Sequence, residues 1–139
     1  MKTNVMKTLA GILGLLAFSL VLFSFVSNTT GNDPWDVPAK YKKMKNPTDV
    51  KDAEGIKIGK SLFKKHCASC HGKSGLGDGK KAAELDTEMP DITTDKYKAQ
   101  LPGVKYYQSF IGRDEMPNFE KKIPDEEDRW FVINYMDTF

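Results

Sequence analysis

The chain has 139 residues, of which 40% are hydrophobic and 29% are charged, with 21 basic and 19 acidic side chains. This length suits a single domain, and the composition is that of a globular protein and not of a disordered one. A net charge of only +2 argues against a nucleic-acid-binding domain, which is expected to be clearly basic.

The first feature along the chain is the uncharged apolar run Leu9–Val26, which Lys2 and Lys7 precede. A basic start followed by an apolar stretch is typical of an export signal. The run is longer than the ~7–15 residues of most cleaved signals, and it falls within the ~17–25 residues that span a membrane. No Ala-x-Ala cleavage pattern follows it. We therefore expect residues 1–27 to be an uncleaved membrane anchor, with a cleaved signal peptide as the alternative.

The next part of the chain, residues 28–51, is rich in turn-forming residues and proline. It is predicted to be a linker and an irregular arm, which Trp35 could pin to the fold. A first helix is predicted from about Asp52 to Cys67, because Asp52 is a good capping residue and apolar or small residues then follow at helical spacing.

The remaining elements are predicted to be helices joined by long loops. Residues 72–79 contain four glycines and must form a loop. Short helices are expected over Lys80–Leu85 and Val104–Ile111. A final helix starts near Pro124 or Asp125, where an acidic first turn suits the helix dipole, and one apolar stripe runs along it: Val132, Tyr135, Met136 and Phe139. No strand-like alternation occurs, so residues 52–139 are predicted to form an all-α domain.

The motif that carries chemistry is Cys67-Ala68-Ser69-Cys70-His71, which has the Cys-x-x-Cys-His pattern of c-type haem attachment. Two thiols form thioethers with the two vinyl groups of the porphyrin, and two intervening residues let one helical turn present both sulfurs. His71 then lies under the iron and can bind it. A large apolar prosthetic group also suits a small domain with long loops and a thin core.

Three other uses of this cysteine pair fit less well. A disulfide between Cys67 and Cys70 would close a very small loop and stabilise little. A thioredoxin-like site expects a βαβ context, of which the sequence shows no sign. A zinc site needs four ligands in separated pairs, whereas His66, Cys67, Cys70 and His71 are crowded together.

The stretch GKSLFKKHCASCHGKSGLGDG resembles the attachment region of bacterial class I (mono-haem) cytochromes c, and so does GRDEMPNF with the later RWFVINY. The resemblance covers about residues 52–139. It implies the cytochrome c fold, in which N- and C-terminal helices cross around a covalently attached haem. It places Gly59 and Phe63 at the crossing on the first helix, and Val132 and Tyr135 on the last.

The family also implies a methionine on a loop as the second axial ligand of the iron. His66, the only other histidine, adjoins Cys67, cannot reach across the porphyrin and is expected on the helix surface. Met89 and Met116 are the candidates. Met116 lies between the last two predicted helices, where the family has its ligand loop, and we predict that it binds the iron opposite His71.

The segment around Met89 resembles the part of the family that passes over the histidine side of the haem. The resemblance implies that the carbonyl of Pro90 accepts a hydrogen bond from His71, which would fix the orientation of the ligand. It also implies that Ile92 packs on the porphyrin.

Charge is distributed unevenly along the exported part. Residues 40–81 carry 12 Lys and 4 acidic residues, a balance of +8, whereas residues 82–139 carry 7 basic and 13 acidic residues, a balance of −6. The Lys-rich half is either a solvated face or a docking surface for redox protein partners, because charge steers encounters between proteins.

These observations favour a one-electron carrier with covalent haem c and His/Met ligation, working in a respiratory or related electron-transfer chain. We expect it at the outer face of the bacterial cytoplasmic membrane or in the periplasm, and we expect no enzymatic activity. The alternatives are a fixed haem subunit of a larger respiratory complex and an open-site haem enzyme acting on a small molecule such as peroxide.

Overall fold

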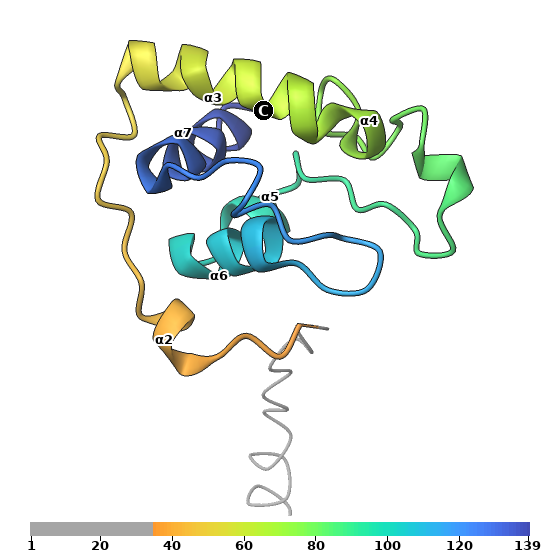
Figure 1. Ribbon diagram of the computed structural model, residues 1–139, viewed down its shortest axis with the longest axis horizontal. Helices are drawn as coiled ribbons and strands as arrows, with labels where there is room; N and C mark the ends of the chain where they lie inside the picture. The colour runs from red at the N-terminus through yellow and green to blue at the C-terminus, as the bar shows by residue number, and fades with distance from the viewer. Residues whose placement is uncertain (1–34) are drawn as a thin grey trace, which may run out of the picture. The chain divides into compact units, whose positions relative to one another are not determined.

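The computed structural model describes residues 35–139, so the predicted anchor or signal at residues 1–27 and the start of the linker lie outside the described residues. Helices and long loops make up the described part (Figure 1), and its only β-type pairing is an isolated bridge between Arg113 and Met116. The predicted all-α class is therefore confirmed. No helix within residues 35–139 is long and apolar enough to cross a membrane.

The helices are short except for two. In chain order they are α2 (Ala39–Lys42), α3 (Ala53–His66), α4 (Ala68–His71), the 3-10 helix η1 (Ala82–Glu84), α5 (Asp95–Lys98), α6 (Pro102–Tyr106), the π-helical turn η2 (Tyr107–Ile111) and α7 (Glu126–Met136). The predicted first and last helices agree with α3 and α7 to within two residues at their starts. The single turns α2 and α5 were not predicted, because four residues are too few to show a helical period.

The long helix α3 begins where its capping residue predicts. The Asp52 carboxylate accepts a hydrogen bond from the amide of Glu54 at 3.0 Å, which satisfies one of the free amides of the first turn. One face of α3 is buried, at Gly55, Gly59 and Phe63. The lysines of α3 lie on its other faces and are exposed.

The second long helix, α7, is buried on more sides than the predicted stripe implies. Asp125 caps it, accepting from the amide of Glu127 at 2.8 Å. The buried residues are Arg129, Trp130, Phe131, Val132, Ile133, Asn134 and Met136. Phe139, which the stripe included, lies beyond the end of the helix. Burial of Arg129 is possible because its guanidinium donates to the Tyr106 hydroxyl and to the Ile123 carbonyl, both at 2.7 Å.

The two long helices pack closely against each other (Figure 1). Gly59 of α3 lies so near the carbonyl of Phe131 that any side chain there would collide with α7 backbone. Next to this contact, the rings of Phe63 and Tyr135 meet edge to face with centroids 5.5 Å apart. Val132 is 1% exposed in the same core, so the predicted helix crossing is confirmed.

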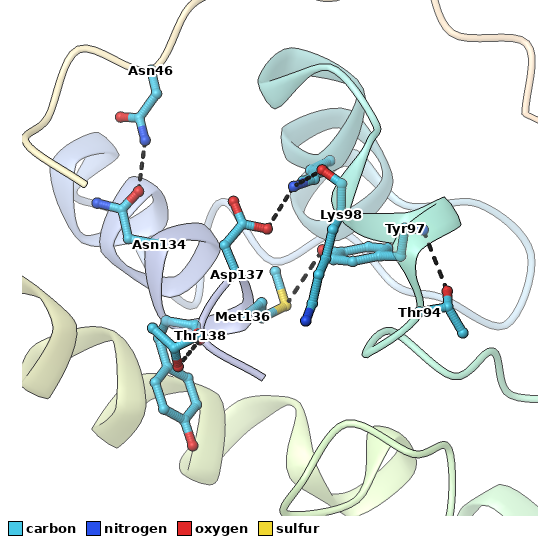
Figure 2. A network of polar contacts seen from close by, with 10 residues as sticks. Asn46, Thr94, Tyr97, Lys98, Asn134, Met136, Asp137 and Thr138 are labelled. Carbon is cyan, nitrogen blue, oxygen red and sulfur yellow. Dashed lines mark hydrogen bonds and ion pairs between the residues drawn. The ribbon is translucent and has the colours of Figure 1, made fainter. Parts of the chain in front are cut away.

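The arm at residues 35–51 packs on this frame. Asn134 of α7 accepts a hydrogen bond from Asn46 at 2.6 Å (Figure 2) and donates one to Thr48 at 3.0 Å. At the start of the arm, the ring of Trp35 lies 4.1 Å from the guanidinium of Arg113. Trp35 therefore pins the arm to the fold, as predicted.

A buried polar cluster joins α5 and α6 to the end of α7 (Figure 2). Lys105 is 3% exposed, and its ammonium pairs with the Asp137 carboxylate and donates to the Lys98 carbonyl at 3.1 Å. The hydroxyl of Tyr97 donates to the sulfur of Met136 at 3.8 Å. Because the buried charge is paired, it is tolerated, and the sulfur of Met136 is part of this packing.

The helix crossing yields a first prediction. Gly59→Ala should lower the free energy of unfolding by about 2 kcal/mol, because the new methyl group overpacks the contact with α7 backbone. Lys60→Ala, one residue away on the exposed face, should change it by less than about 0.5 kcal/mol. Guanidinium unfolding followed by far-UV circular dichroism measures both, and equal stability of the two variants would contradict the close helix contact.

Candidate functional site

The end of α3 and the single turn α4 present the Cys-x-x-Cys-His motif. The amide of Cys67 still bonds to the Phe63 carbonyl at 2.8 Å, and the amides of Cys70 and His71 both bond to the Cys67 carbonyl, at 3.1 and 3.0 Å. One helical turn therefore carries both sulfurs, as the attachment chemistry requires. The two cysteines are free thiols.

A cavity of about 270 Å³ opens beside this turn. Its described lining comes from three stretches of chain: Lys65, His66, Cys67, Ser69, Cys70 and His71; Lys81, Leu85 and Met89; and Glu115, Met116, Pro117, Phe119 and Lys122. Four of the predicted site residues, Cys67, Cys70, His71 and Met116, thus meet at one cavity. Pro90 and Ile92 are not among its described lining residues.

The glycine-rich loop 72–79 folds back on the motif and holds the next segment against it. The amide of Gly77 donates to the His71 carbonyl at 2.9 Å. Gly77 has a φ of +79°, and a Cβ at this position would lie 2.5 Å from the Met89 carbonyl oxygen. Only glycine suits both conditions. The backbone of Met89 is therefore held beside the loop that contacts His71.

The two residues predicted near His71 lie on this segment. Ile92 is 4% exposed, belongs to the hydrophobic core, and its amide donates to the Gly75 carbonyl at 2.9 Å. The Pro90 carbonyl oxygen lies close to Gly77. His71 Nδ1 is buried and makes no hydrogen bond, to Pro90 or to any other described residue. Burial lowers the pKa of His71, which favours the neutral imidazole that binds metals.

Burial also decides the state of the first cysteine. It raises the pKa of Cys67 to about 12, with a smaller contribution from the neighbouring Cys70. A thiol-disulfide exchange site needs a thiol with a depressed pKa, so the thioredoxin-like alternative finds no support. Nor does the zinc alternative, since no three or more His, Cys, Asp or Glu side chains within residues 35–139 are placed so that they could hold a metal ion together.

The Met116 wall of the cavity is a tight turn between η2 and α7. The amide of Met116 donates to the Arg113 carbonyl at 2.8 Å, and Asp114 inside the turn has a left-handed φ of +48°. Met116 packs against the hydrophobic core cluster. Both Met116 and Met89 line the cavity, but they approach it on different loops.

Glu115 is a feature of this turn that the sequence analysis missed. Its carboxylate accepts hydrogen bonds from the amides of Thr87, at 2.8 Å, and Asp86, at 3.1 Å. A hydrogen bond from the Thr87 side chain lowers the pKa of Glu115 most, and the two amide bonds lower it further. No local pattern marks such a contact, because the partners are 28 and 29 residues apart.

His66 was expected on the helix surface, but it is half-buried and lines the cavity. Its Nε2 atom is buried without a hydrogen-bond partner among the described residues, and its ring centroid lies 6.3 Å from that of Phe119. Desolvation lowers the pKa of His66, and the charges of Lys65 and Lys122 lower it further. The expectation failed because the fold brings the Phe119 loop over this end of α3.

The residues present fit a covalently attached haem. Two free thiols, one imidazole and one thioether surround a single cavity, and Leu85 and Phe119 add apolar wall. The Nδ1 of His71 has no hydrogen-bond partner among the described residues, and in an imidazole that binds a metal through Nε2 this nitrogen carries the proton that it donates to an outer-shell acceptor. The thiols come from the same helical turn as the imidazole, whereas the thioether of Met116 comes from a separate loop.

Comparison with known proteins agrees with this reading. The family model described as "Cytochrome C oxidase, cbb3-type, subunit III" matches residues 54–136, which is more than half of the chain. No curated protein matches the chain. The matched segment extends from the first turn of α3 to the last residue of α7 and includes all the described residues that line the cavity.

Proposed function

The chain belongs to the family of cytochrome c oxidase, cbb3-type, subunit III, and on this premise we propose that it is a one-electron carrier in a respiratory or related chain. Membership makes it a class I mono-haem cytochrome c domain with covalently bound haem c, whose work is haem-based electron transfer with redox protein partners. The observation that carries the finer proposal is that Cys67, Cys70, His71 and Met116 line one cavity.

We assign the covalent attachment to Cys67 and Cys70 and the first axial ligand to His71. Support comes from the single turn α4, which aligns the three side chains by hydrogen bonds to the Cys67 carbonyl. Pro90 is the proposed acceptor for Nδ1 of His71, since its carbonyl oxygen lies beside the Gly77 that contacts the His71 carbonyl. Ile92 is proposed to close the apolar floor on the same side.

Met116 is the proposed sixth ligand of the iron. The backbone of Met89 is held beside the His71 loop by the close approach of Gly77. Met116, in contrast, comes from the separate turn between η2 and α7 and packs against the core. A ligand opposite His71 must come from a different wall of the cavity, and this condition favours Met116 over Met89.

The mechanism follows from what these residues hold in place. When bound, the haem supplies an iron that gains and loses one electron. His71 and Met116, both on segments anchored in the core, would keep the coordination constant through that change, which keeps structural reorganisation small. Met116 and Phe119, which belong to or pack on the hydrophobic core, would shield the bound haem from water, and an electron would enter and leave on the solvent-exposed side of the cavity.

Two alternative functions would use the same haem site and differ from a diffusing carrier in testable ways. A fixed subunit of a larger respiratory complex would use the same site without free diffusion, and the family description favours this alternative over the second one. An open-site haem enzyme acting on a small molecule such as peroxide would require that Met116 does not bind the iron. We propose that the protein is a carrier and not an enzyme, because a thioether side chain lines the cavity on a loop separate from α4, which carries His71.

We predict that Met116→Ala abolishes the weak sulfur-to-iron absorption of the oxidised protein. It should also lower the reduction potential, since a thioether favours ferrous iron, and open the iron to carbon monoxide. Met89→Ala is the matched control, from the other loop, and should do none of these things. Haem-stained denaturing gels should show covalent haem in both variants.

The opposite pattern in these two variants would reassign the ligand to Met89. Ready binding of carbon monoxide by the wild-type protein would mean that the site is open and would favour the enzyme. A haem-free band from cells competent in cytochrome maturation would contradict attachment at Cys67 and Cys70.

We further propose that redox partners dock at the cavity mouth, through the Lys-rich half of the chain. Lys65 and Lys81 of that half line the cavity. Lys122 joins them from the acidic half, so the fold concentrates positive charge where the haem edge would be reached. Such a surface attracts partners with acidic surfaces.

Charge reversal at the mouth should slow oxidation of the reduced protein by ferricyanide, a small anionic oxidant. Lys81→Glu and Lys122→Glu should each lower the bimolecular rate constant severalfold at low ionic strength, and added salt should remove the difference, because screening acts over a Debye length of ~8–10 Å. Lys43→Glu, an equal charge change on the arm outside the cavity lining, should have little effect. Stopped-flow absorbance measures all three, and equal slowing by Lys43→Glu would rule out a local docking surface.

We propose the domain order that the sequence predicts: a membrane anchor at residues 1–27, a linker and arm at residues 28–51, and the cytochrome domain at residues 52–139. Residues 35–51 pack on α7 and on Arg113. We therefore propose that this part of the arm is structurally part of the cytochrome domain. The domain would then work at the outer face of the bacterial cytoplasmic membrane or in the periplasm.

The anchor is tested by fractionation. The full chain should stay in the membrane fraction after high-salt washing, because Leu9–Val26 is long enough to span the bilayer, whereas residues 28–139 exported behind a cleavable signal should be released with the periplasm. Mass spectrometry of the mature protein identifies its first residue. An N-terminus near residues 24–32 in a soluble fraction would show that the run is only a signal peptide.

A further inference from the structure

We propose that Glu115 is a positioning residue for the iron site, because its carboxylate fastens the Met116 turn to the segment at Asp86 and Thr87. This inference rests on the proposed ligation by Met116 and adds what holds that ligand in place. It concerns a side chain that does not itself reach the iron.

The contact has the geometry of a specific clamp. One carboxylate oxygen of Glu115 accepts from the Thr87 amide at 2.8 Å, and the other accepts from the Asp86 amide at 3.1 Å. Two successive amides facing one anion form a favourable binding arrangement, and hydrogen bonds to an ionised acceptor are stronger than neutral ones. Each oxygen has its own donor, so the side chain is fixed in direction as well as in distance.

The clamp joins two walls of the same cavity. Glu115 and Met116 belong to one stretch of the lining, and Leu85 and Met89, which flank Asp86 and Thr87 in the chain, belong to another. The turn itself is closed by the bond from Met116 to the Arg113 carbonyl and is contacted at its base by Trp35. Neither of these contacts ties the turn to the segment at Asp86 and Thr87, whereas the Glu115 carboxylate does.

Loss of the clamp should therefore increase the population of a state in which the Met116 turn swings away from the cavity. In that state a small external ligand can replace the thioether. The apparent affinity for such a ligand is proportional to the population of the open state when that state is rare. The apparent affinity for the external ligand therefore reports on the opening of the Met116 turn. The overall free energy of unfolding does not by itself determine this affinity.

The experiment uses the full haem-loaded protein and imidazole as the external ligand, titrated into the oxidised form at neutral pH. Glu115→Ala should raise the apparent imidazole affinity severalfold, because the variant loses both backbone hydrogen bonds to this solvent-exposed, ionised carboxylate. Glu115→Gln should raise it less, because the amide oxygen can still accept from one of the two backbone amides.

Asp114→Asn is the matched control. It removes the same charge from the neighbouring position, and asparagine tolerates the left-handed φ of +48° at residue 114. Its imidazole affinity should equal that of the wild type. If Glu115→Ala yields too little protein, the imidazole affinities of Glu115→Gln and Asp114→Asn are compared instead. Both substitutions replace a carboxylate by an amide of the same shape.

Failure of the clamp and failure of the ligand assignment give different results. If Met116→Ala removes the sulfur-to-iron absorption but neither Glu115 variant differs from Asp114→Asn in imidazole affinity, the clamp is refuted and the ligand stands. If Met116→Ala leaves that absorption intact, the ligand assignment and the clamp are both refuted.

Discussion

The close packing of α3 against α7 is the contact on which the rest of this structure depends. It requires Gly59, because the carbonyl of Phe131 occupies the space of a side chain. α3 continues almost directly into the turn that carries Cys67, Cys70 and His71, so the crossing also fixes where the haem-attachment residues lie relative to the core. A shift of α3 along α7 would move all three together.

The rest of the cavity lining is built on another principle. Loops form it, and contacts between separate segments hold those loops: the close approach of Gly77 to the Met89 carbonyl, the Glu115 carboxylate on two amides and Trp35 on Arg113. The lining thus combines a helical part with a part that several separate loops form. The proposed role as an electron carrier with Met116 as the sixth ligand requires these loops to be as well fixed as the helical part.

The fold also brings positive charges from both halves of the chain to the cavity. The charge difference between residues 40–81 and 82–139 is visible in the sequence, yet the cavity mouth does not follow that boundary. Lys122, from the acidic half, lies at the mouth together with Lys65 and Lys81, and its charge also contributes to lowering the pKa of His66. The positive charge around the cavity therefore depends on how the chain folds, and the composition of one half of the sequence does not account for it.

The amino-acid sequence by itself determined the features that depend on neighbouring residues. The Cys-x-x-Cys-His motif, the capped start of α3 at Asp52 and that of α7 at Asp125, and the loop at residues 72–79 all follow from short-range chemistry. The tertiary structure decided that Met89 and Met116 approach the cavity on different loops, that His66 is half-buried beneath Phe119, and that Glu115 reaches Asp86 and Thr87. Each of these joins residues roughly 30 to 50 positions apart, and the free energy of such contacts is realised only when the chain packs around one core, so no local pattern records them.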